Sequence, residues 1–193
     1  MFSWLKKGKA RTLNKRIFSA RLLTLTAMTA ALYAALTLVF APISFGESLI
    51  EFRISEILNM LVFVNPVFAP GIVLGCFIAN IFSPIGALDM IVGTLGSLIS
   101  ARLMIKCGKN MLAASLCPAI GNIIVGFPIA AYLAADPAFG QYHFWFLFLW
   151  GAGAVVVGEI AVVTVGGNIL FRLILKNKYF KSFLQNIGGR NVE

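Results

Sequence analysis

The segment with the most promising chemistry is residues 44–60, SFGESLIEFRISEILNM. It places four charged residues and an asparagine between two long apolar stretches, namely Glu47, Glu51, Arg53, Glu56 and Asn59. Ionisable residues at the edge of an apolar segment, or inside it, cost free energy in lipid and usually mark a functional site. The segment is therefore predicted to form the mouth of a binding site, with Arg53 and Glu56 on one helical face.

Glu159 is a second candidate, because the stretches on both sides of it, 144–158 and 160–171, carry no charge. A carboxylate at that depth costs about 3 kcal/mol on insertion scales unless a partner, water or ligand meets it. A structural ion pair with Arg53 is one interpretation, and contact with a ligand is the one we favour. Asn80 and Asn122 also lie in apolar runs, where an asparagine either hydrogen-bonds a neighbouring helix or contacts a ligand.

The composition indicates the elements that must position these residues. The 193 residues are 60% hydrophobic and only 12% charged, and the mean hydropathy is +0.91. A soluble globular domain carries about 25% charged residues, so the chain is predicted to be an all-α, polytopic integral membrane protein. The net charge of +9 is concentrated at the chain ends and in one loop, which indicates membrane topology and not nucleic-acid binding.

Six transmembrane helices are predicted. The uncharged run 57–88 is too long for one crossing of a hydrocarbon core of about 30 Å, and Asn65-Pro66 interrupts it. The spans are expected at 22–41, about 51–65, about 68–82, 85–101, within 111–135 and within 144–171. They form a transmembrane domain, 22–175, between a basic N-terminal tail, 1–21, and a basic C-terminal tail, 176–193.

The positive-inside rule supports an even number of crossings. With six spans, every Lys and Arg except Arg53 lies on the cytoplasmic side together with both termini, and the protein resides in the cell membrane. Five of the seven acids then lie in or near external loops: Glu47, Glu51, Glu56, Asp89 and Asp136. This acidic outer half suits a cationic or donor-rich ligand, although acids contribute little to orientation and could lie outside for no functional reason.

The motifs of common enzymes are missing from the sequence, and no cofactor or metal is expected. There is neither a GxxxxGK[ST] phosphate loop nor an HExxH pair, and the only histidine, His143, is predicted at the outer boundary. Cys76 and Cys117 lie in apolar runs and are interpreted as small core residues. An enzyme is therefore disfavoured.

The first predicted span carries a ridge of small residues, Ala27, Ala31 and Ala35, at four-residue spacing. Such a ridge lets another helix approach closely in lipid. It could pack within the protein or present a surface to a partner subunit.

Taken together, these features resemble the substrate-binding (S) component of an energy-coupling factor (ECF) vitamin transporter, and more specifically the QueT group, which is linked to uptake of queuosine precursors. The resemblance covers about residues 20–175. It rests on five motifs: APISFG at 41–46, FRISE at 52–56, GCFIAN at 75–80, LDMIVGTLGSL at 88–98 and GNIIVG at 121–126.

The resemblance implies an importer in which this chain captures substrate from outside. A transmembrane coupling subunit would dock on the alanine ridge, and two ATPase subunits would supply energy. A deazaguanine precursor presents N–H donors, a carbonyl acceptor and, in some forms, a cationic aminomethyl arm, which match carboxylate, amide and guanidinium groups. Under this hypothesis Glu159 or Glu56 contacts the base edge and Asp89 or Glu47 the ammonium, while Arg53, Asn80 and Asn122 complete the polar lining.

Three alternatives remain open. The chain could be an S component for another small vitamin, or a stand-alone carrier of small solutes that needs no partner. It could also be a structural or interaction protein, in which case neutralising Glu56 and Glu159 would leave function intact.

Overall fold

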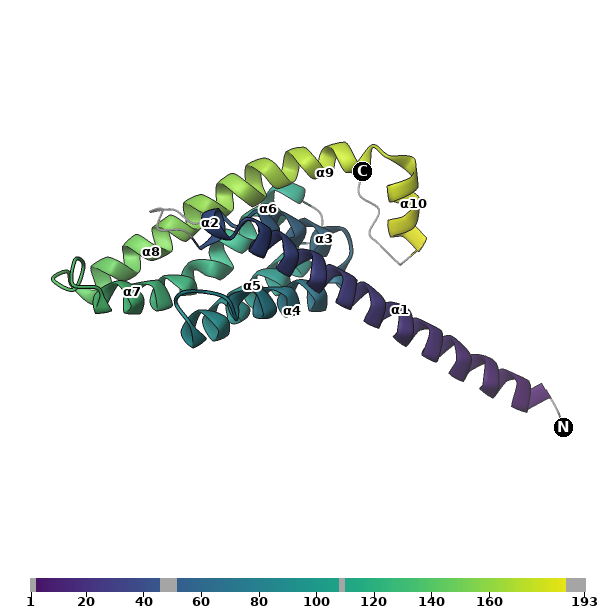
Figure 1. Cartoon of the computed structure of the whole chain (residues 1–193). Coiled ribbons are helices and arrows are strands. Elements are labelled where there is room, and N and C mark those ends of the chain that lie inside the picture. Colours follow the sequence, from purple (N-terminus) through teal and green to yellow (C-terminus); the bar gives the residue numbers. More distant parts are fainter. Residues whose placement is uncertain (1–2, 46–51, 108–109, 187–193) are drawn as a thin grey trace.

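The computed structural model describes residues 3–45, 52–107 and 110–186 of the chain. All secondary structure in these ranges is helical, as the sequence predicts. The helices form an elongated bundle from which the N-terminal part of the first helix projects (Figure 1).

Four helical stretches are long and apolar enough to cross a membrane: Ala20–Val39, Ala87–Cys107, Met111–Ala135 and Phe144–Leu175. They coincide with the first, fourth, fifth and sixth predicted spans. The prediction of a helical membrane protein is therefore confirmed.

The second and third predicted spans form a helical hairpin. Its first limb is the 3-10 helix η1 (Ile54–Leu58) followed by α3 (Asn59–Val64), and its second limb is the 3-10 helix η2 (Pro66–Phe68) followed by α4 (Ala69–Asn80). Asn65 between them is extended, and its side-chain Oδ1 accepts from the Val67 amide at 3.0 Å. Proline disfavours a helical conformation in the residue before it, which explains the break at Asn65-Pro66. Both limbs are shorter than the four long helices, so six crossings remain a prediction.

Helix α1 (Ser3–Val39) has two different faces along its apolar part. Ala30, Tyr33 and Ala34 are buried, and α4 lies against this face. A Cβ at Gly75 of α4 would come within 2.7 Å of Tyr33 Cβ, so glycine is needed for this close approach. Helix α1 also continues without interruption through the predicted basic tail.

The other helices complete the bundle around the hairpin. Helix α5 (Ala87–Cys107) contacts both α4 and α6 (Met111–Gly121). The fifth stretch continues through the 3-10 helix η3 (Asn122–Val125) into α7 (Gly126–Ala135). The sixth comprises α8 (Phe144–Glu159), the π-helix η4 (Ile160–Gly167) and α9 (Asn168–Leu175).

The hydrophobic core surrounds α3, whose last five residues, 60–64, include four fully or almost fully buried apolar side chains: Met60, Val62, Phe63 and Val64. Cys76 and Cys117 belong to the same core, as predicted. Helix α3 is thus enclosed by protein. The long helices instead expose many large apolar side chains.

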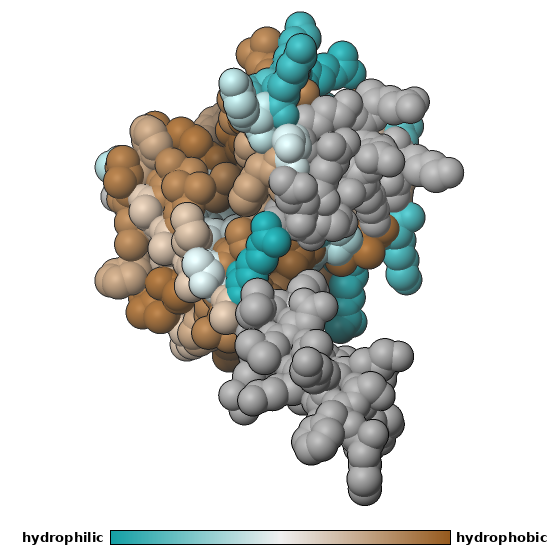
Figure 2. Space-filling view, turned by 90° about the vertical axis from the view of Figure 1, so that its right-hand side faces the viewer, coloured by the Kyte–Doolittle hydropathy of each residue, from teal (hydrophilic) through white to brown (hydrophobic). Residues whose placement is uncertain are grey.

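The short helix α2 (Ala41–Ser44) follows the C-terminal end of α1, whereas α10 (Lys178–Asn186) lies at the end of the molecule where α1 starts (Figure 1). Seen from that end, hydrophobic residues cover one flank, and hydrophilic residues gather at the top and along the opposite side (Figure 2). The start of α1 and α10 share one end of the bundle (Figure 1), as an even number of crossings requires.

Candidate functional site

A polar pocket lies among η1, α4, α5, η3, α8 and η4. The empty space between its walls is about 380 Å³, which includes open solvent at its mouth. Its lining comprises Arg53, Glu56, Cys76, Gly93, Ser97, Asn122, Val125, Val155, Gly158, Glu159 and Val162. Charged groups from two separate segments, residues 53–56 and α8, therefore meet in one cavity.

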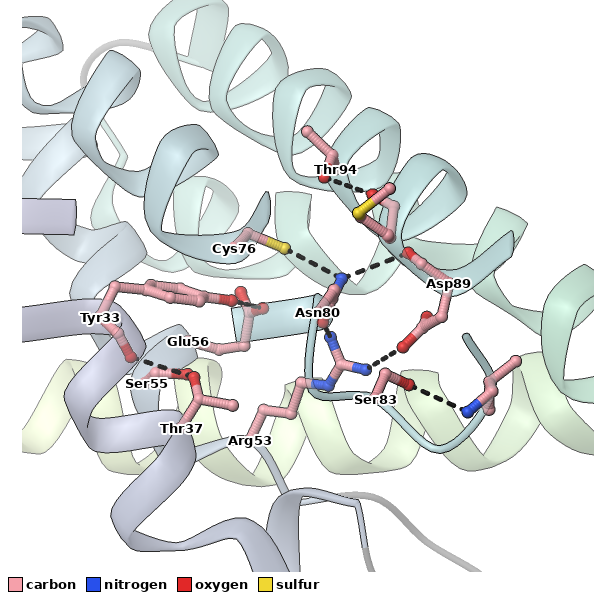
Figure 3. A network of polar contacts seen from close by, with 12 residues as sticks. Tyr33, Thr37, Arg53, Ser55, Glu56, Cys76, Asn80, Ser83, Asp89 and Thr94 are labelled. Carbon is pink, nitrogen blue, oxygen red and sulfur yellow. Dashed lines mark hydrogen bonds and ion pairs between the residues drawn. The ribbon is translucent and has the colours of Figure 1, made fainter. Parts of the chain in front are cut away.

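Glu56 on η1 is held by two side chains. Its Oε1 accepts a hydrogen bond from the Tyr33 hydroxyl of α1, and its Oε2 accepts one from the Asn59 amide. Next to this pair, the Thr37 and Ser55 hydroxyls are 2.7 Å apart (Figure 3). The carboxylate is only 2% exposed, so α1 and α3 together fix its orientation in the pocket wall.

The Arg53 side chain extends from the residue before η1 towards α4 and α5. Its Nη1 donates to Asn80 Oδ1 at 3.0 Å, and its Nη2 lies 3.2 Å from Asp89 Oδ2 in an ion pair (Figure 3). The Asn80 amide in turn donates to the Asp89 carbonyl oxygen at 3.3 Å. The guanidinium carbon also lies 5.3 Å from the centre of the Phe45 ring. Asn80 and Asp89 thereby position Arg53.

The opposite wall pairs Asn122 with Glu159. The Asn122 amide donates to Glu159 Oε1, and both side chains are buried. Asn122 begins the 3-10 helix η3, and Glu159 is the last residue before the π-helix η4. Single π-helical turns and 3-10 breaks are frequent at functional sites because they change the direction of side chains.

Glycines on α5 make room for these amides. A Cβ at Gly93 would clash with Asn80 Nδ2, and one at Gly96 would clash with Asn122 Oδ1. Only a residue without a side chain therefore allows both asparagines to approach α5 as they do.

The predicted site residues divide into three groups. Arg53, Glu56, Asn122 and Glu159 line the pocket together. Asn80 and Asp89 contact Arg53 and are not part of the pocket lining. Glu47, like Glu51, lies outside the described residues. Asp136 is exposed at the end of α7.

Sequence reasoning missed Tyr33, the two glycines of α5 and Ser97. Tyr33 carried a usable signal, because a phenol in the middle of an apolar span needs a hydrogen-bond partner when it is buried. The glycines carried none, because their role depends on residues of other helices.

The site combines charged, polar and apolar surface. Two carboxylates, an amide, a guanidinium and the Ser97 hydroxyl face one cavity whose other walls are apolar, which is the usual composition of a small-molecule site. Within the described ranges there is no group of three or more side chains able to hold a metal ion.

Fold and site together define a helical membrane protein with a buried polar pocket. The family model described as "QueT transporter" matches residues 23–176, and the chain belongs to this family. It is also 30% identical over 154 residues to the "Queuosine precursor transporter QueT" of Lactococcus lactis subsp. cremoris (strain MG1363), which covers 76% of this chain and 88% of the relative. No solved structure matches the chain.

Proposed function

We propose that the protein is the substrate-binding subunit of an ECF-type importer and captures a queuosine precursor, queuine or a related deazaguanine. The observation that carries this proposal is the convergence of Glu56, Asn122 and Glu159 on one pocket in a member of the QueT transporter family.

The pocket chemistry supports a deazaguanine. The N–H donors on the base edge need acceptors, which Glu56 and Glu159 supply, and the ring carbonyl needs a donor, which Asn122 or Arg53 supplies. Cys76, Val125 and Val162 give the pocket apolar surface for the ring. Since Asp89 is fully buried and paired with Arg53, Glu47 is the better acceptor for a cationic arm.

Energy coupling would use the other face of α1. Ala27, Ala31 and Ala35 are all exposed, in contrast to the buried face that carries Tyr33. This exposure supports docking of a transmembrane coupling subunit on the ridge. Two ATPase subunits would supply the energy for transport. Six crossings and cytoplasmic termini complete the proposal.

The test is calorimetric binding of queuine and of its aminomethyl precursor to the purified protein, with Glu159→Gln alongside. The substitution keeps the size of the side chain and removes one acceptor charge. We expect tight binding by the wild type and at least a tenfold loss of affinity in the variant, about 1.4 kcal/mol.

Absence of binding by a folded wild type would overturn the queuosine assignment and leave other vitamins to be tested. A second experiment tests coupling: Ala31→Leu should abolish uptake into cells that contain the coupling module while purified protein still binds substrate. Uptake in cells that lack the module would instead support a stand-alone carrier.

A further inference from the structure

A second concave surface lies along α4 and α5, and it shares no lining residue with the polar pocket. Exposed Leu74 and Phe77 form part of one wall. The groove is lined by Ala69, Pro70, Val73, Leu74, Phe77, Thr94, Leu98, Ala101, Arg102 and Ile105. Nine of these ten side chains are uncharged, and the tenth is an arginine.

The groove begins next to a close contact between α4 and α5. At Gly93 the helices approach so closely that a Cβ would clash with Asn80, and the groove starts one residue further along α5, at Thr94. From Thr94 to Ile105 is eleven residues, or about 16 Å of helix. That length matches one leaflet of a hydrocarbon core that is about 30 Å thick.

Arg102 lies near the end of the groove that the basic residues predict to be cytoplasmic. It is exposed, and no acidic side chain pairs with it among the described residues. Asp89, the acid on the same helix, is thirteen residues away, or about 20 Å. A guanidinium near the cytoplasmic end of a span can extend to the membrane–water interface and bind a phosphate group through two parallel hydrogen bonds.

We infer that this groove binds one anionic phospholipid, with an acyl chain along the apolar walls and the headgroup phosphate on Arg102. The apolar groove is as long as one leaflet and complements the acyl chain. The arginine at its end, which no acidic side chain neutralises among the described residues, complements the headgroup phosphate. A helix of a partner subunit would match the apolar walls but would leave the arginine without an anion.

The probe is phosphatidylglycerol, added to delipidated protein in detergent and followed by native mass spectrometry, with phosphatidylcholine as the comparison lipid. Arg102→Gln removes the headgroup contact, and Leu74→Trp fills the groove. Arg172→Gln and Leu173→Trp on α9, both at exposed positions, are the matched controls.

We expect one phosphatidylglycerol to be retained by the wild type and by both controls, and its occupancy to fall at least tenfold in Arg102→Gln and in Leu74→Trp. Equal retention of phosphatidylcholine, or equal occupancy in all variants, would overturn the inference. So would loss of binding to a coupling module in Leu74→Trp with lipid occupancy unchanged, because a protein would then be the occupant. Substrate binding should stay at the wild-type level in all four variants, which separates this test from that of the proposed function.

Discussion

The polar pocket and a second buried polar cluster use similar residues for different purposes. The second cluster, hereafter the inner cluster, joins Ser115 of α6 to Thr164 and Asn168 of the last stretch. The Asn168 amide donates to Ser115 Oγ at 2.8 Å and to the Thr164 carbonyl oxygen at 2.6 Å, and the Thr164 hydroxyl donates to the Ser115 carbonyl oxygen at 3.0 Å.

The difference between the two clusters lies in charge and in space. The inner cluster is uncharged, its donors are used within the protein, and none of its members lines the polar pocket. The pocket instead gathers Arg53, Glu56 and Glu159 beside a cavity. In lipid, hydroxyl and amide groups are ordinary links between helices, whereas charges carry a cost that a function must justify. The inner cluster therefore connects the π-helix to α6, whereas the pocket is the proposed ligand site.

The largest effect is expected from Arg53→Met, which leaves the fully buried Asp89 carboxylate without its cation. Breaking a buried ion pair from one side costs about 3–5 kcal/mol of unfolding free energy. Chemical or thermal unfolding in detergent measures this loss. The double variant Arg53→Met/Asp89→Leu should recover most of it, and a loss below about 1 kcal/mol in the single variant would show that the pair is not structural.

Gly96→Ala should damage the pocket without changing any of its charges. The new methyl group would collide with Asn122 Oδ1 and displace the amide from Glu159. Overpacking of this kind costs about 1–3 kcal/mol of stability. Because the displaced amide also releases Glu159, we expect a loss of substrate affinity of roughly fivefold or more by calorimetry. Gly153→Ala on α8 is the control, because no heavy atom lies within 4 Å of that added Cβ. Equal affinities in the two variants would contradict the role of Gly96.

Asn168→Ala tests the inner cluster. Removing the amide leaves the Ser115 hydroxyl without its donor, which should lower the unfolding free energy by about 1–3 kcal/mol. Substrate affinity should stay within about twofold of the wild type, because the residue does not line the pocket. A tenfold loss of affinity at unchanged stability would show that the inner cluster takes part in substrate binding. The proposed difference between a structural cluster and a binding pocket would then be wrong.

Tyr33→Phe should give the smallest effect. It removes one hydrogen bond to Glu56 and keeps the ring, so a change of about 1 kcal/mol, or roughly fivefold in substrate affinity, is expected. Tyr132→Phe, at a half-exposed position on α7, is the control and should bind as the wild type does. An unchanged affinity in Tyr33→Phe would mean that the carboxylate keeps its orientation without α1.

Much of the fold could be predicted because its signals are local. Asn65-Pro66 divides the long apolar run where a helix must stop, and the flanks of Glu159 show that its carboxylate lies deep in the bundle. The contacts of Asp89 could not be predicted, since its pairing with Arg53 depends on how α5 is rotated against the hairpin. Periodicity sets such rotations poorly when a span is apolar on all sides. The roles of Gly93 and Gly96 were hidden for the same reason.

The enclosed position of α3 bears on how the protein enters the membrane. The limb 54–64 is short, and with Glu56 and Asn59 at its start it partitions poorly into lipid as an independent segment. Outside the limb itself, Glu56 and Ser55 hydrogen-bond to Tyr33 and Thr37 of α1. Stable insertion of this limb therefore requires α1 to be in the membrane first, so here the order of synthesis along the chain is also the order of assembly.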